Sequence, residues 1–513
     1  MISAIYGATT FGINAYTVTI ETHFSTKIPK TYNIVGLPDS AVKEARERVA
    51  AAIQNSGFHF PNRSITVNLA PADVRKEGSG FDLPIALAII CEASQLIPDM
   101  LAQYVFVGEL SLDGKLRPVK GILPITMASK EKNMKGIIVP EENAREAAMV
   151  DGIDVHPLGT LQEVVDFLNS GGGLEPFKVN RDEIFNIDQR SIVDFADVKG
   201  QQEVKRAMEI AAAGGHNIIM IGPPGSGKTM LAKRLPTILP PMTFEEALET
   251  TKIHSVAGLL PANTAIVSVR PFRSPHHTVS DIALVGGGPH AKPGEISFAH
   301  HGVLFLDELP EFQKNALEVL RQPMEDGRVT ISRSKITVEY PTSFMLASAM
   351  NPCPCGNFGN PNQECTCNPQ QVQKYMSKIS GPLLDRIDIH IQVQAVKYKD
   401  LSSKTEAEPS KNIRERVIKA REIQQERFKE KKNIYCNAHM GSKDIKEFCG
   451  IDSASEELMK MAITKLGLSA RAYDRILKVA RTIADLTGEE KISSSHISEA
   501  IQYRSLDRAM WLG

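Results

Sequence analysis

The sequence feature that most constrains this chain is a glycine-rich stretch of eight residues that begins at Gly222. It matches the pattern G-x-x-x-x-G-K-[ST] at every fixed position. An apolar run over 217–221 predicts a buried strand before it, and 230–235 predicts the start of a helix after it. In such a strand–loop–helix unit, backbone N–H groups and the helix N-terminus surround phosphate oxygens. The stretch comprises Gly222, Pro223, Pro224, Gly225, Ser226, Gly227, Lys228 and Thr229.

The last two residues of this phosphate loop predict that ATP binds together with Mg²⁺. We expect Lys228 to reach the β- and γ-phosphates and the Thr229 hydroxyl to bind Mg²⁺.

Polar residues at the ends of two further apolar strands predict hydrolysis of the bound nucleotide. Asp307 and Glu308 follow the apolar run 302–306, so they should lie at the same sheet edge as the phosphate loop. We expect Asp307 to hold Mg²⁺ and Glu308 to orient and polarise the attacking water. Asn351 ends a third apolar strand, 344–350, where its amide is expected to bind the γ-phosphate or to position water.

Length, charge and apolar content narrow the classes of function. The 513 residues leave room for about three domains, and 42% apolar residues are typical of a globular protein. A net charge of -1 predicts that any surface for nucleic acid is local. The sequence has no recognisable signal peptide and no apolar run long enough to span a bilayer, so we expect a cytoplasmic location without membrane contact.

Shifts in composition predict the domain organisation. The segment 1–173 carries strand and helix patterns of its own and ends in a run of glycines. A polar linker is expected over 174–190, and the ATPase core over 191–397 with a cysteine-containing insert at 353–367. The remaining segment, 398–513, has the apolar periodicity of several helices.

Residue ranges can be predicted for several strands and one helix of the first segment. Alternating apolar residues over 65–69 predict a strand, and the apolar spacing over 42–53 predicts a helix that Asp39 or Ser40 caps. Short apolar runs at 104–108 and 136–140 predict two more strands.

Four clustered cysteines predict a metal site. They form a C-x-C pair followed by a second C-x-C pair, and four thiolates suit a tetrahedral, structural Zn²⁺. An iron–sulfur cluster and four reduced, metal-free thiols are the alternatives. The adjacent His276 and His277 are expected to point to opposite faces of a strand and so not to share one ion. The four cysteines are Cys353, Cys355, Cys365 and Cys367.

Two segments between these motifs are candidates for contact with DNA. The glycine-rich stretch 286–294 predicts a flexible loop that carries Lys292. Alternating residues over 327–338 predict a hairpin whose tip carries Arg333 and Lys335, two cations that can contact a phosphate backbone. Both segments also fit ordinary solvated surface loops.

Three stretches of the core resemble the AAA+ ATPase of magnesium-chelatase-like proteins, in particular the bacterial YifB/ComM family. They are 271–277, 301–312 and 349–356. The resemblance implies an α/β P-loop AAA+ domain with a helical lid formed by the C-terminal segment. It also implies a ring, expected to be a hexamer, that acts on single-stranded or branched DNA and drives branch migration in recombination or natural transformation. Magnesium insertion into a porphyrin and remodelling of proteins are the alternative functions.

The resemblance extends to arginines that act on a neighbour's nucleotide. The stretch 381–388 resembles the family's arginine-finger segment, which implies that Arg386 reaches the γ-phosphate of an adjacent subunit. Pairing of Arg386 with Asp385 or Asp388 is the alternative. The stretch 469–475 is similar to the lid motif, which implies that Arg471, and secondly Arg475, bind the γ-phosphate.

The first segment is similar to the Lon protease domain over 75–84 and 107–124. That resemblance implies an α+β fold and a Ser-Lys dyad. The nucleophile position falls at Gly80 and the lysine position falls near Leu123 and Pro124, so we expect no peptidase activity. Ser79, one residue from the nucleophile position, leaves an active peptidase as the alternative.

Overall fold

The computed structural model of the chain divides into two compact units, which are described separately. The first unit contains Met1–Asp188 and Thr243–Ser268, and the second contains Gln189–Met242 and Val269–Gly513. None of the helices in the described part of the chain has the length and apolarity that crossing a bilayer requires. The structure describes residues 5–26, 29–93, 98–180, 193–261, 264–289, 291–333, 336–360, 363–395, 407–431, 434–466 and 468–504.

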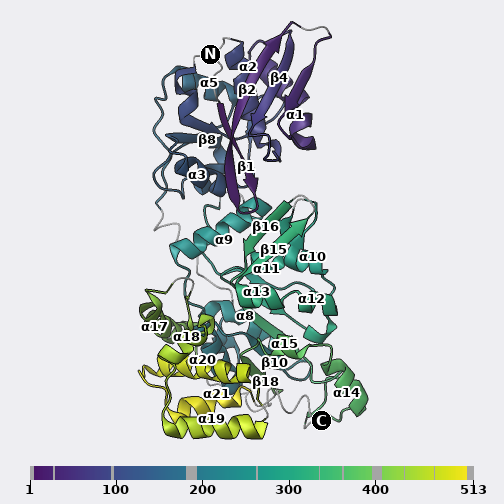
Figure 1. Cartoon of the computed structure of the whole chain (residues 1–513), viewed down its shortest axis with the longest axis vertical. Coiled ribbons are helices and arrows are strands. Elements are labelled where there is room, and N and C mark those ends of the chain that lie inside the picture. Colours follow the sequence, from purple (N-terminus) through teal and green to yellow (C-terminus); the bar gives the residue numbers. More distant parts are fainter. Residues whose placement is uncertain are drawn as a thin grey trace. The chain divides into compact units, whose positions relative to one another are not determined.

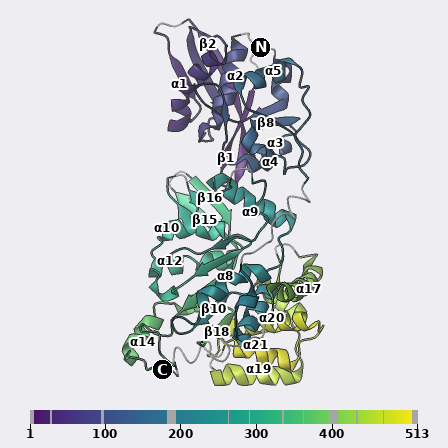
Figure 2. The ribbon, with the colours of Figure 1, turned by 180° about the vertical axis from the view of Figure 1, so that it is seen from behind.

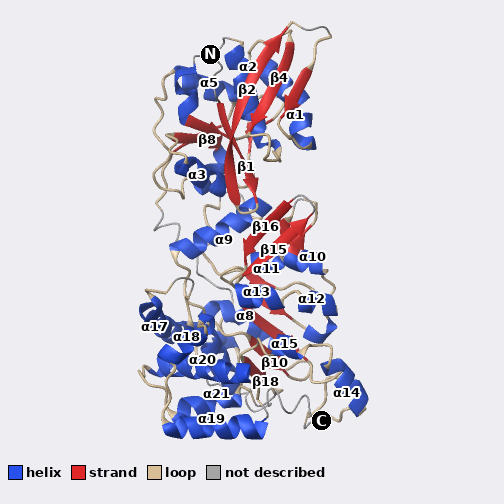
Figure 3. Cartoon of the chain, in the orientation of Figure 1, coloured by secondary structure: helices blue, strands red, loops and turns tan. Residues whose placement is uncertain are grey.

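The first unit is built on a mixed sheet of seven strands in the order β3-β4-β2-β1-β5-β8-β9 (Figures 1 and 3). Strand β2 pairs antiparallel with β1 and β4, whereas β5, β8 and β9 run parallel to one another. A separate short pair, β6 with β7, turns at Asp113 and Gly114. The strands are β1 Ile5–Phe11, β2 Asn14–Ser25, β3 Tyr32–Val35, β4 Ser64–Ala70, β5 Tyr104–Phe106, β6 Glu109–Leu110, β7 Leu116–Arg117, β8 Gly136–Pro140 and β9 Asp154–Leu158.

Local sequence patterns account for much of this unit. Strand β4 buries Ile65, Val67 and Leu69, which confirms the strand predicted from their alternation. Helix α1 begins where predicted, because the Asp39 side chain accepts a hydrogen bond from the Val42 N–H at 2.8 Å. The helices are α1 Ser40–Asn55, α2 Asp82–Glu92, α3 Ile122–Glu131, α4 Ala144–Ala147, α5 Leu161–Asn169 and α9 Phe244–Ala257.

Helix α9 comes from the middle of the predicted ATPase segment but packs in the first unit. Its N-terminus is fixed by a capping box between Thr243 and Glu246. Its Ser255 hydroxyl donates to the buried carboxylate of Glu146, which also accepts the Leu123 N–H at 2.9 Å. The expected continuous core of 191–397 is therefore interrupted, because contacts with helix α3 and Glu146 hold α9 in the other unit.

The second unit contains a parallel sheet of five strands in the order β11-β14-β17-β10-β18 (Figure 1). Ile221, the last residue of β10, pairs with Met350 of β17 and with Gln392 of β18. The residues that follow these strands therefore emerge at one carboxyl edge of the sheet. The strands are β10 Ile218–Ile221, β11 Phe272–Arg273, β14 Val303–Leu306, β17 Met345–Met350 and β18 Ile389–Gln392.

Helices surround this sheet, and those of the C-terminal segment gather beside it (Figures 1 and 2). Helices α17, α18, α19, α20 and α21 lie in this segment, for which the apolar spacing predicts several helices. The helices are α7 Gln202–Gly214, α8 Lys228–Ile238, α10 Asp281–Val285, α11 Glu295–Phe298, α12 Lys314–Glu318, α13 Arg321–Asp326, α14 Pro369–Met376, α15 Gly381–Leu384, α17 Ser410–Phe428, α18 Ser442–Phe448, α19 Ser453–Leu466, α20 Ala470–Thr487 and α21 Ser494–Gln502.

Two hairpins of the second unit pack together. The stretch predicted as a flexible loop is instead a short ribbon of β12 (Gly286–Gly287) and β13 (Lys292–Pro293). The predicted hairpin is present as β15 (Arg328–Arg333) and β16 (Ile336–Pro341). The Tyr340 hydroxyl of β16 donates to the Ala291 carbonyl at 2.9 Å, which ties the two hairpins together.

We predict that Asp82→Ala destabilises the first unit. Asp82 is buried and binds Arg48 at 2.6 and 3.0 Å, and it accepts the Leu110 N–H at 3.1 Å. Its loss leaves these donors unpaired, which should lower the free energy of unfolding by about 2–4 kcal/mol. Urea unfolding followed by circular dichroism would measure the change. Arg75→Ala, in an exposed ion pair with Glu77, should cost less than about 1 kcal/mol. Equal effects of the two changes would contradict this account.

Candidate nucleotide-binding site

The predicted phosphate loop lies between strand β10 and helix α8. Gly225 and Gly227 have φ angles of 74° and 89°, a left-handed region that glycine adopts without strain. Helix α8 begins at Lys228, so its first backbone N–H groups face the loop. The Gly222 N–H donates to the Met350 carbonyl at 3.2 Å, and this bond ties the loop to the end of strand β17.

Lys228 begins helix α8, and oxygen acceptors surround its ammonium. Its Nζ donates to the carbonyls of Gly222 at 2.7 Å and Pro223 at 2.9 Å, and to Asn351 Oδ1 at 3.2 Å. Burial lowers the pKa of Lys228, whereas the nearby carboxylates of Asp307 and Glu308 act in the opposite direction. Phosphate oxygens are stronger acceptors than these neutral groups, so a phosphate can take their place.

Thr229 and the two acidic residues form the second part of the site. The Thr229 hydroxyl donates to Asp307 Oδ2 at 2.6 Å. The other Asp307 oxygen accepts the Glu308 N–H at 2.9 Å, and Glu308 has a φ of 52°, which is unusual for a residue with a side chain. A hydroxyl and a carboxylate so close together are ligands of the kind that Mg²⁺ prefers.

A histidine beside Glu308 was not predicted as part of this site. His277 Nδ1 lies 3.3 Å from Glu308 Oε2. The expectation that His276 and His277 point to opposite faces of a strand is wrong. Strand β11 ends at Arg273, and the two rings lie side by side with centroids 4.1 Å apart. Sequence patterns carry no signal for the contact with Glu308, because His277 and Glu308 are distant in the chain.

The four clustered cysteines come together near the phosphate loop. The Cys353 sulfur lies 3.4 Å from that of Cys355 and 3.7 Å from that of Cys365, and the sulfurs of Cys355 and Cys365 are 3.6 Å apart. The Cys367 sulfur accepts the Cys355 N–H at 3.4 Å. Sulfurs about 3.8 Å apart are expected around one tetrahedral ion with bonds of about 2.3 Å. The arrangement is therefore compatible with a metal ion held by all four thiolates.

Arg386 lies at the opposite edge of the sheet from the phosphate loop. It precedes strand β18, and its own carbonyl accepts a hydrogen bond from Asn217, the residue before strand β10. Its buried guanidinium pairs with Glu325, rather than with Asp385 or Asp388, and donates to the Pro382 carbonyl at 2.5 Å. The hydrogen bond from Arg386 lowers the pKa of Glu325.

The two C-terminal arginines lie at this same amino edge. Arg475 contacts the buried Asp388 at 2.9 Å, and His216 contacts the other oxygen of Asp388 at 3.1 Å. Burial alone would raise the pKa of Asp388, but the charge of Arg475 and the contact with His216 outweigh it and hold this pKa below its usual range. Arg471 is exposed, and its charge acts on Glu325.

The candidate DNA contacts are only partly described. Lys292 lies exposed on β13. Arg333 is the last residue of β15, and Lys335 lies outside the described residues.

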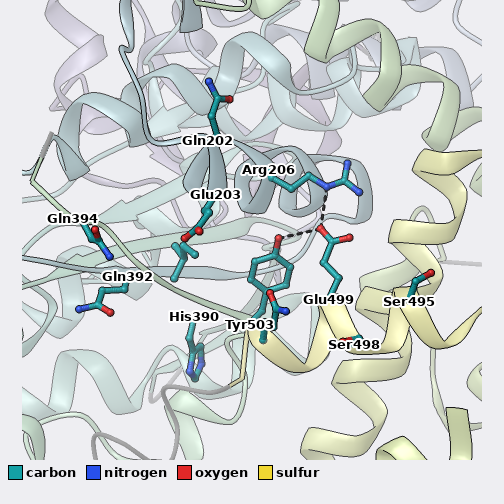
Figure 4. A pocket seen from close by; sticks show the side chains of 12 residues that line it. Gln202, Glu203, Arg206, His390, Gln392, Gln394, Ser495, Ser498, Glu499 and Tyr503 are labelled. Carbon is teal, nitrogen blue, oxygen red and sulfur yellow. Dashed lines mark hydrogen bonds and ion pairs between the residues drawn. The ribbon is translucent and has the colours of Figure 1, made fainter. Parts of the chain in front are cut away.

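A cavity of about 850 Å³ lies beside strand β18 (Figure 4). It is lined by side chains of helix α7, strand β18 and helix α21, and Glu499 there accepts from Arg206 at 3.0 Å and from Tyr503 at 3.2 Å. The predicted site residues all lie outside its lining. It adjoins the phosphate loop through Gln201, whose amide donates to the carbonyls of Ser226 at 2.8 Å and of Gln394, a lining residue, at 3.2 Å.

Comparison with known families identifies the class of protein. Three family models match this chain: "Magnesium chelatase, subunit ChlI" over 194–401, "Subunit ChlI of Mg-chelatase" over 20–143, and "Magnesium chelatase, subunit ChlI C-terminal" over 407–504. The parallel sheet with its phosphate loop is therefore a magnesium-chelatase-like AAA+ domain, a class that suggests ATPase activity with ATP and Mg²⁺.

Full-length relatives define the family within this class. The chain is 44% identical to competence protein ComM of Haemophilus influenzae and 43% identical to YifB of Escherichia coli, each over 99% of this chain and 98% of the relative. The 38 kDa magnesium-chelatase subunit of Rhodobacter capsulatus is 22% identical over 45% of this chain and 70% of that protein. The chain belongs to the ComM/YifB family of magnesium-chelatase-like proteins, which confirms the resemblance noted from its motifs.

Proposed function

We propose that this chain is an ATP-hydrolysing ring motor that acts on DNA and drives branch migration in recombination or natural transformation. The observation that carries the proposal is that the site residues are divided between the two edges of the five-stranded sheet. The phosphate loop, Asp307 and Asn351 lie at its carboxyl edge, whereas Arg386 and Arg475 lie at its amino edge. Residues at opposite edges serve one reaction when two copies meet, so each site is completed by a neighbour.

Each side chain at the carboxyl edge takes a defined part in the proposed hydrolysis. Lys228 holds the β- and γ-phosphates, and Thr229 with Asp307 holds Mg²⁺, which supplies charge neutralisation when bound. Glu308 orients and polarises water at the γ-phosphate, and Asn351 positions that phosphate through the amide that contacts Lys228. His277 limits the freedom of the Glu308 carboxylate.

The arginines at the amino edge act in trans in this proposal. Arg386 acts as the arginine finger when the γ-phosphate of a neighbouring subunit replaces Glu325 as its partner. Its Nε is a buried donor with no acceptor among the described residues, so the guanidinium has a donor left beyond those that Glu325 and Pro382 occupy. Arg471 and Arg475, on the C-terminal helices proposed as the lid, add positive charge at the same edge. A closed ring, expected as a hexamer, follows from head-to-tail contact.

The paired hairpins form the proposed contact surface for DNA. They carry the exposed Lys292, and Arg333 ends strand β15, whereas the predicted cation Lys335 lies outside the described residues. The bond between Tyr340 and Ala291 couples the two hairpins. Cations on such hairpins can contact phosphates without reading sequence, which suits a motor that follows single-stranded or branched DNA. The name of the ComM relative supports a role in competence.

We assign a structural Zn²⁺ to the four cysteines. Their ligand atoms all lie within 4.8 Å of one another, which suits a single ion. An iron–sulfur cluster places its own iron and sulfide atoms between the thiolates and needs more space.

We also propose that the segment 1–173 is a Lon-protease-like domain without peptidase activity. Gly80 offers no nucleophile, and the buried Leu123 and Pro124 offer no lysine at the second dyad position.

We predict that Glu308→Gln retains nucleotide binding but lowers the rate of ATP hydrolysis at least about 100-fold. The amide keeps the shape of the carboxylate but cannot polarise water in the same way. Phosphate release and the binding of a fluorescent ATP analogue would measure both effects. Glu311→Gln is the matched control, since Glu311 is an exposed carboxylate paired with Lys378 at 3.2 Å. Near-normal hydrolysis by Glu308→Gln would refute the assignment.

We predict that two inactive variants complement each other when mixed. Lys228→Ala lacks a working phosphate loop, and Arg471→Ala lacks an exposed arginine of the opposite edge. A random mixture forms about a quarter of its sites from intact halves, so ATPase activity should reappear on mixing. Mixed samples of Lys228→Ala with Glu308→Gln should stay inactive, because both defects lie in the same half-site. Absence of recovery with Arg471→Ala would contradict a shared site.

We predict that the purified chain moves the branch point of a four-way DNA junction in the presence of ATP, and that branched or single-stranded DNA stimulates its ATPase.

We predict that Lys292→Ala weakens DNA binding and lowers the salt dependence of that binding by about one charge, because one phosphate contact is lost. Lys429→Ala, which removes an exposed lysine of the C-terminal segment, is the control. ATPase activity without DNA stimulation or junction movement would instead favour a chelatase-type or protein-remodelling function.

A further inference from the structure

The cysteine loop packs directly against the phosphate loop. We define the cysteine knuckle as the described residues 353–360 and 363–367. Gly356, buried within it, has a φ of 84°, and a Cβ at this position would lie 2.4 Å from Pro224 Cδ. The phosphate loop and the knuckle are therefore so close that a glycine is required between them.

A second connection runs along strand β17. Met350, at its end, accepts the Gly222 N–H at 3.2 Å, and the next residue, Asn351, contacts Lys228 Nζ at 3.2 Å. Cys353 follows two residues later and is fully buried. The end of strand β17, which positions Lys228, is thus followed closely in sequence by Cys353, the first cysteine of the knuckle.

The sulfurs of the knuckle also organise its backbone. The Cys353 sulfur accepts the Phe358 N–H at 3.3 Å, and the Cys367 sulfur accepts the Cys355 N–H at 3.4 Å. Phe358 itself is exposed, so the loop does not bury its large apolar side chain. A bound ion that fixes the sulfurs would therefore supply much of the energy that orders this loop.

We propose that zinc in the cysteine knuckle controls the phosphate loop, so that metal occupancy sets the affinity of the site for ATP. The inference rests on the proposed function only in that the loop Gly222–Thr229 binds nucleotide. Zinc fixes the turn at Gly356, which supports Pro224, and it fixes the end of strand β17, which positions Asn351 against Lys228. Loss of zinc releases both supports at once.

Coupling of this kind acts in both directions. If zinc strengthens ATP binding by a given factor, ATP must strengthen zinc binding by the same factor. Bound nucleotide should therefore slow the extraction of zinc by a chelator. Lys228→Ala, which is expected to lose nucleotide binding but to keep zinc, should show no such protection.

Two glycines of the knuckle provide a matched test. Gly356→Ala and Gly359→Ala both place a side chain at positive φ, at 84° and 73°, but only Gly356 faces Pro224, and Gly359 has open space. We expect both variants to keep about one zinc ion per chain. Gly356→Ala should weaken binding of a fluorescent ATP analogue by about tenfold or more, whereas Gly359→Ala should bind it like the unchanged chain.

The other possible results decide whether zinc occupancy and nucleotide affinity are coupled. Equal nucleotide affinity of the two variants would overturn the proposal, as would a purified wild-type chain without zinc. Zinc extraction at the same rate with and without ATP would overturn it too, provided that circular dichroism shows the chain still folded. A chain that binds ATP and zinc as described but moves no DNA would overturn the motor function alone, because neither readout involves DNA.

Discussion

The parallel register of three neighbouring strands is the constraint on which the candidate site depends. Strand β10 pairs with β17, and β17 with β14, so that the residues after all three strands emerge together. Lys228 Nζ therefore lies 3.2 Å from Asn351 Oδ1, and the Thr229 hydroxyl lies 2.6 Å from Asp307 Oδ2, although the residues of each pair are distant in sequence. A change that slipped this register would separate the phosphate loop from its acidic partners without altering any of the side chains themselves.

The same register separates the arginines from the phosphate loop. Asp388 lies before strand β18 and is held between His216, before strand β10, and Arg475 from a C-terminal helix. A buried carboxylate with these two partners fixes the C-terminal helices to the amino edge of the sheet, because removing either partner would leave its charge poorly compensated. In the proposed ring, a rigid attachment of this kind would transmit a displacement at a neighbour's nucleotide to the C-terminal helices.

Sequence reasoning worked where the determining interactions are local. The cap at Asp39, the alternation in strand β4 and the strand–loop–helix unit around Lys228 all depend on residues close together in the chain. It missed features set by distant contacts. Helix α9 packs in the other unit through Ser255 and Glu146, and Glu325, rather than Asp385 or Asp388, pairs with Arg386. His276 and His277 were misjudged because the predicted strand ends before them, which changes the direction of their side chains.

The ion pair between Arg386 and Glu325 suggests how such a site can avoid hydrolysis before assembly. A carboxylate resembles a phosphate in charge and in its two acceptor oxygens, so Glu325 can occupy the arginine until a neighbour's γ-phosphate competes for it. The carboxylate is exposed whereas the guanidinium is buried, and exposed carboxylates bind more weakly because water competes. The exchange of partners can therefore be close to balanced in energy. In the proposed ring, Arg386 would then be freed from Glu325 only where a nucleotide-bearing subunit stands next to it, which would link assembly to turnover.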